Sequence, residues 1–107
     1  MYLGIDLGTS AVKLLLLDEN GKIVKTLSKG YGVNYLNGNW AEQSPDEWWS
    51  TVSSGLKDIL DESSKEKLKS ISFSGQMHGL VLLDKEDKVI RPAIIWCDQR
   101  TEKECEE

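Results

Sequence analysis

The first 28 residues contain three short segments suited to β-strands, and their close spacing constrains the fold more than any other feature. Residues 2–6 form one apolar run, and residues 12–17 form a second that is apolar except for a single lysine. A continuous apolar run of this length is typical of a strand buried on both faces. Asn20 and Gly21 then give a strong hairpin signal before residues 22–28. The chain is therefore predicted to begin as an antiparallel three-stranded meander.

A helix is predicted to begin after Ser44. This serine can cap the helix, Pro45 suits the first helical position, and Glu47 completes an S-x-x-E capping box. Apolar residues then recur at helical spacing, as expected of a helix with one face toward a core. They are Trp48, Trp49, Val52, Leu56, Ile59 and Leu60. The two tryptophans are assigned to this core rather than to stacking on a ligand.

The remaining segments complete an α/β pattern. Residues 30–43 are rich in glycine and asparagine and are expected to form a loop. Residues 71–73 alternate apolar and polar, as a strand does, and residues 80–83 and 89–96 are expected to form a hairpin. Three strands, a helix, a strand and a hairpin match the first part of a ribonuclease-H-like (actin/hexokinase-type) fold. This fold is a mixed sheet with flanking helices, of which the chain would be the N-terminal portion only.

Composition excludes several classes of partner. The net charge of −5 and the pI near 4.9 argue against nucleic acid, because phosphate backbones need a basic face. No segment approaches the roughly 20 apolar residues of a membrane span, and the N-terminus lacks the basic region of a signal peptide. Cys97 and Cys105 fit neither a metal-ligand spacing nor a disulfide framework. Reduced thiols are expected, and with them a cytoplasmic location.

The first candidate for chemistry is the segment Asp-Leu-Gly-Thr-Ser at residues 6–10. Asp6 at the end of a strand could hold Mg²⁺ through waters, as in phosphoryl-transfer sites. Gly8 would let backbone N–H groups approach phosphate oxygens, and the hydroxyls of Thr9 and Ser10 could donate further bonds. The same composition also occurs in ordinary hairpin turns, so this segment alone does not decide between the two interpretations.

Three further segments complete an ordered set of motifs. G-Q-M-H-G stands at residues 75–79, W-C-D-Q-R at 96–100, and W-A-E-Q-S-P-D-E-W-W at 40–49. Together with residues 6–10 they resemble the FGGY family of carbohydrate kinases over nearly the whole chain. Within that family the resemblance is strongest to kinases that act on D-xylulose. One departure is Cys97, which stands where the family often has asparagine.

The resemblance implies an ATP-dependent and Mg²⁺-dependent phosphorylation of a ketopentose, converting D-xylulose to D-xylulose 5-phosphate. Asp6 would bind or orient Mg²⁺ near the γ-phosphate, and Gly8, Thr9 and Ser10 would bind the nucleotide's phosphates. The implied sugar-binding residues are Met77, His78, Gln76 as their support, and, with less defined roles, Asp98 and Arg100. His78 is the only histidine, and the glycines on either side of its segment favour a sugar contact over simple packing.

The same resemblance implies that residues 1–107 are the N-terminal part of a sugar-binding domain. The rest of that domain, the aspartate that accepts the hydroxyl proton and the nucleotide-binding domain would then lie beyond residue 107. The chain alone is expected to be inactive and, with a sheet edge and apolar faces uncovered, to self-associate. The full-length protein is expected to be a homodimer.

Alternatives remain open at this point. A kinase of the same family could act on ribulose, gluconate or glycerol. A ribonuclease-H-like nuclease would also place an aspartate in its first strand, but it needs further carboxylates to hold two metals about 4 Å apart. One of these should end the strand after the helix, where Gly75 and Gln76 stand instead. A non-catalytic binding module is the third possibility.

Overall fold

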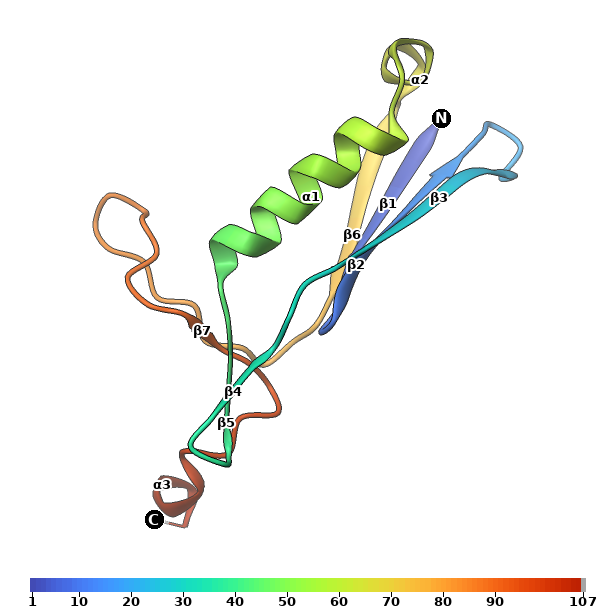
Figure 1. Ribbon diagram of the computed structural model, residues 1–107. Helices are drawn as coiled ribbons and strands as arrows, with labels where there is room; N and C mark the ends of the chain where they lie inside the picture. The colour runs from blue at the N-terminus through green and yellow to red at the C-terminus, as the bar shows by residue number, and fades with distance from the viewer. Residues whose placement is uncertain (107) are drawn as a thin grey trace.

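The structure is a computed structural model and describes residues 1–106. A four-stranded sheet has the order β3-β2-β1-β6. Its strands are β1 (Tyr2–Leu7), β2 (Ala11–Leu17), β3 (Ile23–Gly30) and β6 (Ser70–Gly75). The strands β1, β2 and β3 pair antiparallel, whereas β6 pairs parallel to β1. The sheet is therefore mixed, and the predicted meander and α/β class are confirmed (Figure 1).

Helix α1 (Pro45–Ile59) packs across one face of this sheet, mainly over β2 and β3. Ser44 caps it as predicted, since its Oγ accepts from the N–H of Glu47 at 3.3 Å. Gly55 allows a close approach, because a Cβ there would lie 2.9 Å from a methyl of Leu14. The buried core between helix and sheet consists of Leu3, Ile5, Val12, Leu14, Leu16, Tyr31, Val52 and Ile59.

The two tryptophans at the start of α1 lie in different environments. Trp48 packs against the core as predicted, whereas the prediction was wrong for Trp49, which is 69% exposed. Consecutive helical residues differ by about 100° in direction, so the two cannot share one face.

The opposite face of the sheet is open, so the prediction that residues 12–17 are buried on both faces was wrong. Val12, Leu14 and Leu16 are buried beneath α1, but Lys13 is exposed and Leu15 only partly buried. No layer covers the second face among the described residues. A shallow hollow of about 560 Å³ runs across it.

A second, smaller sheet extends from the first and has the order β4-β5-β7. It consists of β4 (Asn34–Leu36), β5 (Trp40–Gln43) and β7 (Ala93–Ile94). The prediction of a loop over residues 30–43 was therefore wrong. Asn37 and Gly38 have φ angles of +51° and +79°, so they make the tight turn of a hairpin instead of marking a loop.

The predicted hairpin over residues 80–96 is present only in part. Single bridges join Leu80 to Ile94 and Leu83 to Val89, and only Ala93–Ile94 has the pairing of a strand. Two short helices complete the chain, α2 (Glu62–Lys67) and α3 (Glu102–Cys105). In the part of the chain that the structure describes, none of the helices has the length and apolar character needed to cross a membrane.

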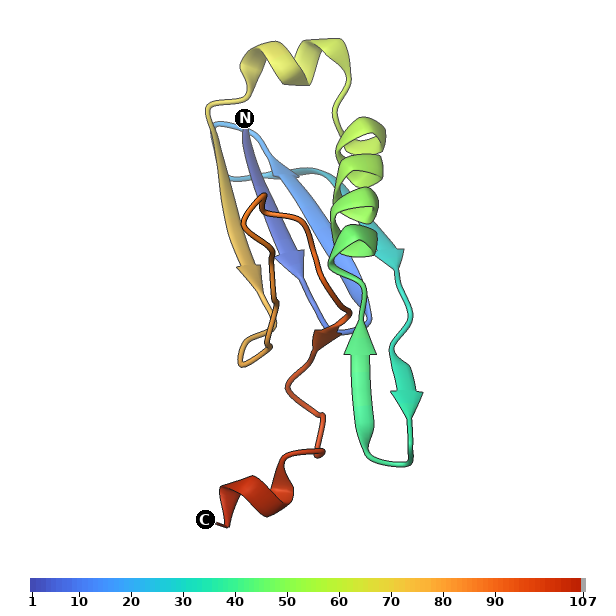
Figure 2. The ribbon, with the colours of Figure 1, turned by 90° about the vertical axis from the view of Figure 1, so that its left-hand side faces the viewer.

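Strand β6 forms one edge of the larger sheet and carries exposed apolar side chains. Ile71 and Phe73 are the register partners of Leu3 and Ile5, yet they are 44% and 73% exposed while those two are buried. Helix α1 does not reach over this edge (Figure 2). An uncovered strand edge with large apolar groups is a site for pairing with another chain.

We therefore expect the isolated 107-residue chain to self-associate through β6. Light scattering after size exclusion should show a mass that rises with concentration, and Phe73→Ser should reduce that rise. Tyr35→Ser is the matched control, because Tyr35 is 72% exposed but lies on β4 of the other sheet. A monodisperse monomer at high concentration, or an equal response to both substitutions, would contradict this expectation.

Candidate functional site

The turn between β1 and β2 lies where the two sheets meet, and its conformation is fixed by close backbone contacts. The N–H of Gly8 donates to the carbonyl of Ala11 at 3.0 Å. A Cβ on Gly8 would lie 3.0 Å from that same oxygen, so glycine is the residue that fits. Asp6 is exposed on the open face of the sheet opposite Lys13, its register partner in β2.

All three carbonyls of this turn point toward donors in the protein. The Tyr31 hydroxyl donates to the carbonyl of Gly8, and the Tyr31 N–H donates to that of Ser10 at 3.0 Å. The side-chain Nε2 of Gln43 donates to the carbonyl of Thr9 at 2.5 Å. Burial and then the charge of Asp6 raise the pKa of Tyr31, so it stays protonated as a donor.

The N–H groups of Thr9 and Ser10, in contrast, donate to no acceptor within residues 1–106. With the carbonyls held from behind, these amides and the adjoining hydroxyls are free to meet an anion. Concave arrays of backbone N–H groups bind phosphates in this way without a net positive charge.

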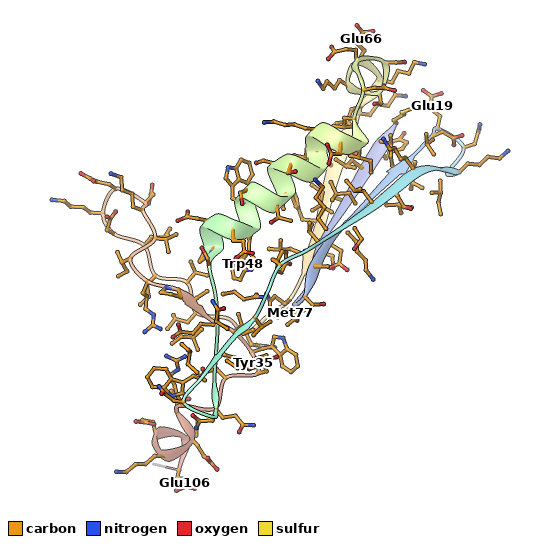
Figure 3. All side chains as sticks on the ribbon, viewed as in Figure 1. Glu19, Tyr35, Trp48, Glu66, Met77 and Glu106 are labelled. Atoms are coloured by element: carbon orange, nitrogen blue, oxygen red, sulfur yellow. The ribbon has the colours of Figure 1, made fainter. Side chains whose placement is uncertain are left out.

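The segment after β6 lies beside this turn because β6 runs parallel to β1. The N–H of Gln76 donates to the carbonyl of Leu7 at 2.9 Å. Gly75 is required at this contact, since a Cβ there would lie only 2.8 Å from the same oxygen. The carboxyl ends of the two parallel strands therefore bring residues 6–10 and 76–78 to the same edge, at the junction where Met77 is seen (Figure 3).

The segment also contains an unusual backbone conformation and an unpaired acceptor. His78 has a φ of +61°, outside the hairpin turns that account for Asn37 and Asp87. Strained non-glycine residues of this kind concentrate at functional sites. Gln76 Oε1 is buried and has no hydrogen-bond partner among the described residues, which is uncommon enough in folded proteins to mark a candidate site.

A hollow of about 330 Å³ lies between the two motifs. It is lined by Thr9, Gln76, Met77, His78 and Trp96. The indole N–H of Trp96 donates to Thr9 Oγ1 at 2.9 Å, which closes one wall. The structure therefore brings together four of the residues predicted from sequence, with Asp6 at the end of the adjoining strand.

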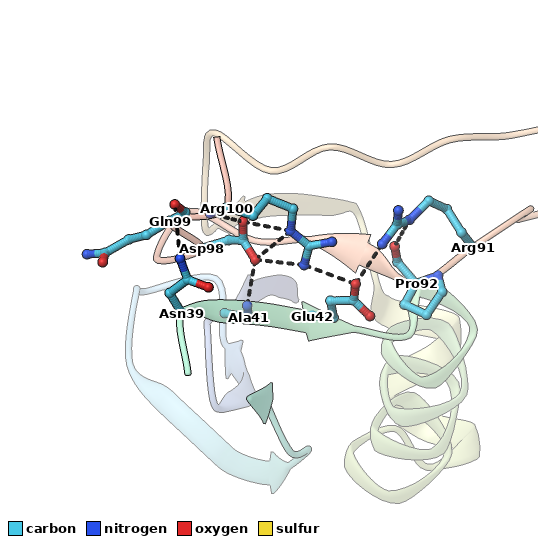
Figure 4. Close-up of polar contacts among 8 residues, drawn as sticks. All are labelled: Asn39, Ala41, Glu42, Arg91, Pro92, Asp98, Gln99 and Arg100. Atoms are coloured by element: carbon cyan, nitrogen blue, oxygen red, sulfur yellow. Dashed lines mark hydrogen bonds and ion pairs between the residues drawn. The ribbon is translucent and has the colours of Figure 1, made fainter. Parts of the chain in front are cut away.

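Asp98 and Arg100, which were also predicted to lie near the sugar, belong to a separate ion-pair cluster (Figure 4). Arg100 Nη2 lies 2.7 Å from Asp98 Oδ1 and 3.0 Å from Glu42 Oε1, and Arg91 Nη2 lies 2.6 Å from the same Glu42 oxygen. The guanidinium of Arg100 also stacks over Trp40 at 4.1 Å. Neither Asp98 nor Arg100 lines the hollow beside His78.

This cluster fixes the segment after β7 to the hairpin. Asp98 Oδ1 accepts from the N–H of Ala41 at 2.6 Å, and Asp98 Oδ2 accepts from the N–H of Arg100 at 3.0 Å. Hydrogen bonds from the Arg100 side chain, together with these amides, lower the pKa of Asp98 to about 2. The carboxylate is thus ionised at any pH near neutrality and holds Trp96 and its neighbours next to β5.

Sequence analysis missed Tyr31, Glu42 and Gln43. Each lies in the stretch expected to be a loop, yet all three are buried. The adjacent pair Glu42-Gln43 within an otherwise glycine-rich and asparagine-rich stretch was the available signal. Their position in a strand beside the turn at residues 8–10 could not be inferred without recognising the hairpin.

The described residues give no support to a two-metal nuclease site. They contain no group of three or more histidine, cysteine, aspartate or glutamate side chains placed to hold a metal ion. Strand β6 ends at Gly75 and is followed by Gln76, where such an enzyme would need a further carboxylate.

Comparison with known proteins agrees with the sequence motifs. The chain matches the FGGY family of carbohydrate kinases, N-terminal domain, over residues 1–107. It is 43% identical over 105 residues to the xylulose kinase of Escherichia coli (strain K12), covering 98% of this chain and 22% of that protein. It is 37% identical over 100 residues to the gluconokinase of Bacillus subtilis (strain 168), covering 94% and 20%.

A solved structure has the same fold. The crystal structure of a "xyloylose kinase" from Brucella ovis superimposes with a TM-score of 0.87 at 39% identity, covering 96% of this chain and 22% of that one. The chain therefore belongs to the FGGY family of carbohydrate kinases, and its fold is the N-terminal portion of that family's actin/hexokinase-like structure. It spans about a fifth of the length of the relatives that it matches.

Proposed function

We propose that this chain is part of an ATP-dependent sugar kinase that converts D-xylulose to D-xylulose 5-phosphate. The observation that carries the proposal is the meeting of two motifs at one sheet edge: a turn with free amides at Thr9 and Ser10, and the strained segment at His78. One suits a phosphate and the other a polyhydroxylated ligand. The xylulose kinases among the relatives support D-xylulose as the sugar.

Asp6 and the turn that follows it would form the phosphate side of the site. The amides of Thr9 and Ser10 and their hydroxyls would bind the transferring phosphate, with Gly8 permitting its close approach. The site offers Mg²⁺ one exposed carboxylate, that of Asp6. This fits an ion that keeps several waters and takes its other ligands from ATP phosphates. When bound, Mg²⁺ would neutralise charge on those phosphates.

Met77 and His78 would form the sugar side. Met77 is 71% exposed and offers an apolar surface to the sugar's carbon chain, while neutral imidazole can donate to one oxygen or accept from one hydroxyl. Gln76 would support both. Sugar contacts by Asp98 and Arg100 remain a prediction, and their ion pairs support a positioning role for them.

A neutral sugar suits this hollow better than the carboxylate of gluconate. None of its five lining residues is a lysine or an arginine, and a buried carboxylate needs a cation or several donors. This favours D-xylulose over gluconate, the substrate class named for one relative. Ribulose and glycerol remain alternatives that only assays can separate.

The rest of the kinase is proposed to lie outside residues 1–107. On this proposal the chain is the first part of the sugar-binding domain, and other parts of the protein supply the proton acceptor and the adenine site. We also propose a homodimeric protein in the cytoplasm, a location that the free thiols of Cys97 and Cys105 support.

The test is a substrate panel on the full-length protein that carries this chain. We expect ATP-dependent and Mg²⁺-dependent phosphate transfer with kcat/KM highest for D-xylulose, ahead of D-ribulose, gluconate and glycerol. Isolated residues 1–107 serve as the control and should show no turnover. Preference for another sugar would overturn the assignment of D-xylulose, and absence of transfer to every sugar would overturn the kinase itself.

His78→Ala in the full-length protein should weaken D-xylulose more than ATP. One neutral hydrogen bond contributes about 0.5–1.5 kcal/mol, so kcat/KM for the sugar should fall roughly 2- to 13-fold from binding alone. His78→Asn can restore part of the loss, because an amide also donates and accepts. If His78 were only packed, the substitution would instead lower the melting temperature and leave the ratio of the two KM values unchanged.

A further inference from the structure

Gln43 is almost fully buried, at 1% exposure, and its side-chain amide makes four hydrogen bonds. Its Nε2 donates to the carbonyl of Thr9 at 2.5 Å and to that of Gly32 at 3.3 Å. Its Oε1 accepts from the indole N–H of Trp48 at 3.1 Å and from Nε2 of Gln76 at 2.9 Å. A primary amide has two donors and two acceptor positions, so every one of them is used.

The orientation of this amide is dictated by its neighbours. The indole N–H of Trp48 can only donate, so the atom facing it must be the oxygen of Gln43. The carbonyls of Thr9 and Gly32 can only accept, so the atom facing them must be the nitrogen. Since the Gln43 oxygen also faces Gln76, the Gln76 amide must turn its nitrogen inward.

Gln43 thereby joins the two sides of the site directly. One of its atoms holds the backbone of the turn at residues 8–10, and the other holds the side chain that begins the segment at 76–78. Trp48 fixes the same amide to α1. The turn and the segment otherwise come from different strands, so their relative position depends on this bridge as well as on the β1–β6 pairing.

From this geometry we infer that Gln43 is a positioning residue that sets the placement of the transferring phosphate relative to the sugar hydroxyl. The inference rests on the proposed kinase function and deepens it. Gln43 touches neither substrate, since it does not line the hollow. Its role would be to keep the phosphate-side turn and the sugar-side segment in register, which is the kind of alignment that governs transfer between two bound groups.

The test compares Gln43→Met and Gln43→Glu in the full-length protein. Methionine keeps the length without hydrogen bonds, and glutamate keeps the shape but loses both donors. Gln76→Met cuts the bridge from its other end, should a Gln43 variant fail to fold. Ser64→Ala is the matched control, because Ser64 is also a buried polar residue but caps α2 far from the site.

The decisive quantity is the rate of D-xylulose phosphorylation divided by the rate of ATP hydrolysis without sugar. Both rates scale with the folded fraction, so a purely structural defect leaves the ratio unchanged. We expect the ratio to fall by about 10- to 100-fold in the Gln43 variants. The KM values should change little, and Gln76→Met should reproduce the direction of the fall. Ser64→Ala should leave the ratio at its wild-type value.

A ratio that stays within about twofold of wild type in the Gln43 variants, while wild type is active, would overturn this inference alone. The same holds if Ser64→Ala lowers the ratio as much. A wild-type protein that phosphorylates no sugar would instead overturn the proposed function, and with it any transfer role of Gln43. The two failures are therefore distinguishable.

Discussion

Replacing Asp6 by alanine in the full-length protein should lower kcat for D-xylulose phosphorylation by about 100- to 1,000-fold, the effect typical of losing one group that stabilises transition-state charge. The KM for D-xylulose should change far less, because Asp6 lies on the phosphate side and does not line the hollow beside His78. A loss confined to kcat indicates an interaction made chiefly in the transition state. Steady-state kinetics at saturating ATP and varied Mg²⁺ would measure it.

Two variants make this experiment specific. Asp6→Asn keeps the shape but removes the charge, so it should resemble alanine if the carboxylate acts through Mg²⁺. Lys13→Met removes the cation opposite Asp6 in the register of β1 and β2 and should leave kcat near the wild-type value. A kcat unchanged in Asp6→Ala would remove Asp6 from the mechanism. A loss equal in Lys13→Met would assign the effect to the pair instead.

The parts of the fold that could be predicted from sequence are those with strong local signals. The Asn20-Gly21 turn and the Ser44-Pro45 helix start depend on nearby residues alone, and both are present. The hairpin of β4 and β5 was missed because Asn37 and Gly38 were interpreted as loop composition, although the same residues favour a tight turn. Only pairing with β7, from the other end of the chain, shows this segment to be a sheet.

The candidate site was predicted in its motifs but not in its framework. Asp6, Thr9 and the segment at residues 76–78 carried recognisable patterns. Gln43 carries no local signal for its role, because a single buried amide that bridges two distant segments becomes visible only when those segments are in place. Arg100 shows the reverse: its position beside Asp98 suggested a ligand contact, whereas its side chain is occupied by ion pairs.

Asp98→Ala should produce the largest loss of stability among the substitutions considered. Its side chain is only 3% exposed and forms ion pairs and hydrogen bonds with Arg100 and the N–H of Ala41. Removing one partner of a buried ion pair leaves the other charge uncompensated, which costs about 3 kcal/mol or more. We expect the free energy of unfolding to fall by that amount at pH 7, measured by urea denaturation with tryptophan fluorescence, since Trp40 lies under Arg100.

The pH dependence identifies the cause of that loss. The pKa of Asp98 is lowered to about 2 in the folded chain from an ordinary value of 3.8. Its ionised form therefore stabilises the fold fully above pH 4, and this contribution disappears as the pH falls from about 4 to 2. The stability difference between wild type and Asp98→Ala should shrink over that interval.

Asp84→Ala is the matched control, because Asp84 also accepts two backbone N–H groups, those of Glu86 and Lys88, but lies in an exposed turn. It should cost no more than about 1 kcal/mol. Equal losses in the two variants would show that the buried ion pair contributes nothing beyond the turn hydrogen bonds. The KM for D-xylulose separates the remaining possibility: if Asp98 contacts the sugar, the full-length variant raises that KM, whereas a role confined to the cluster lowers stability and leaves KM unchanged.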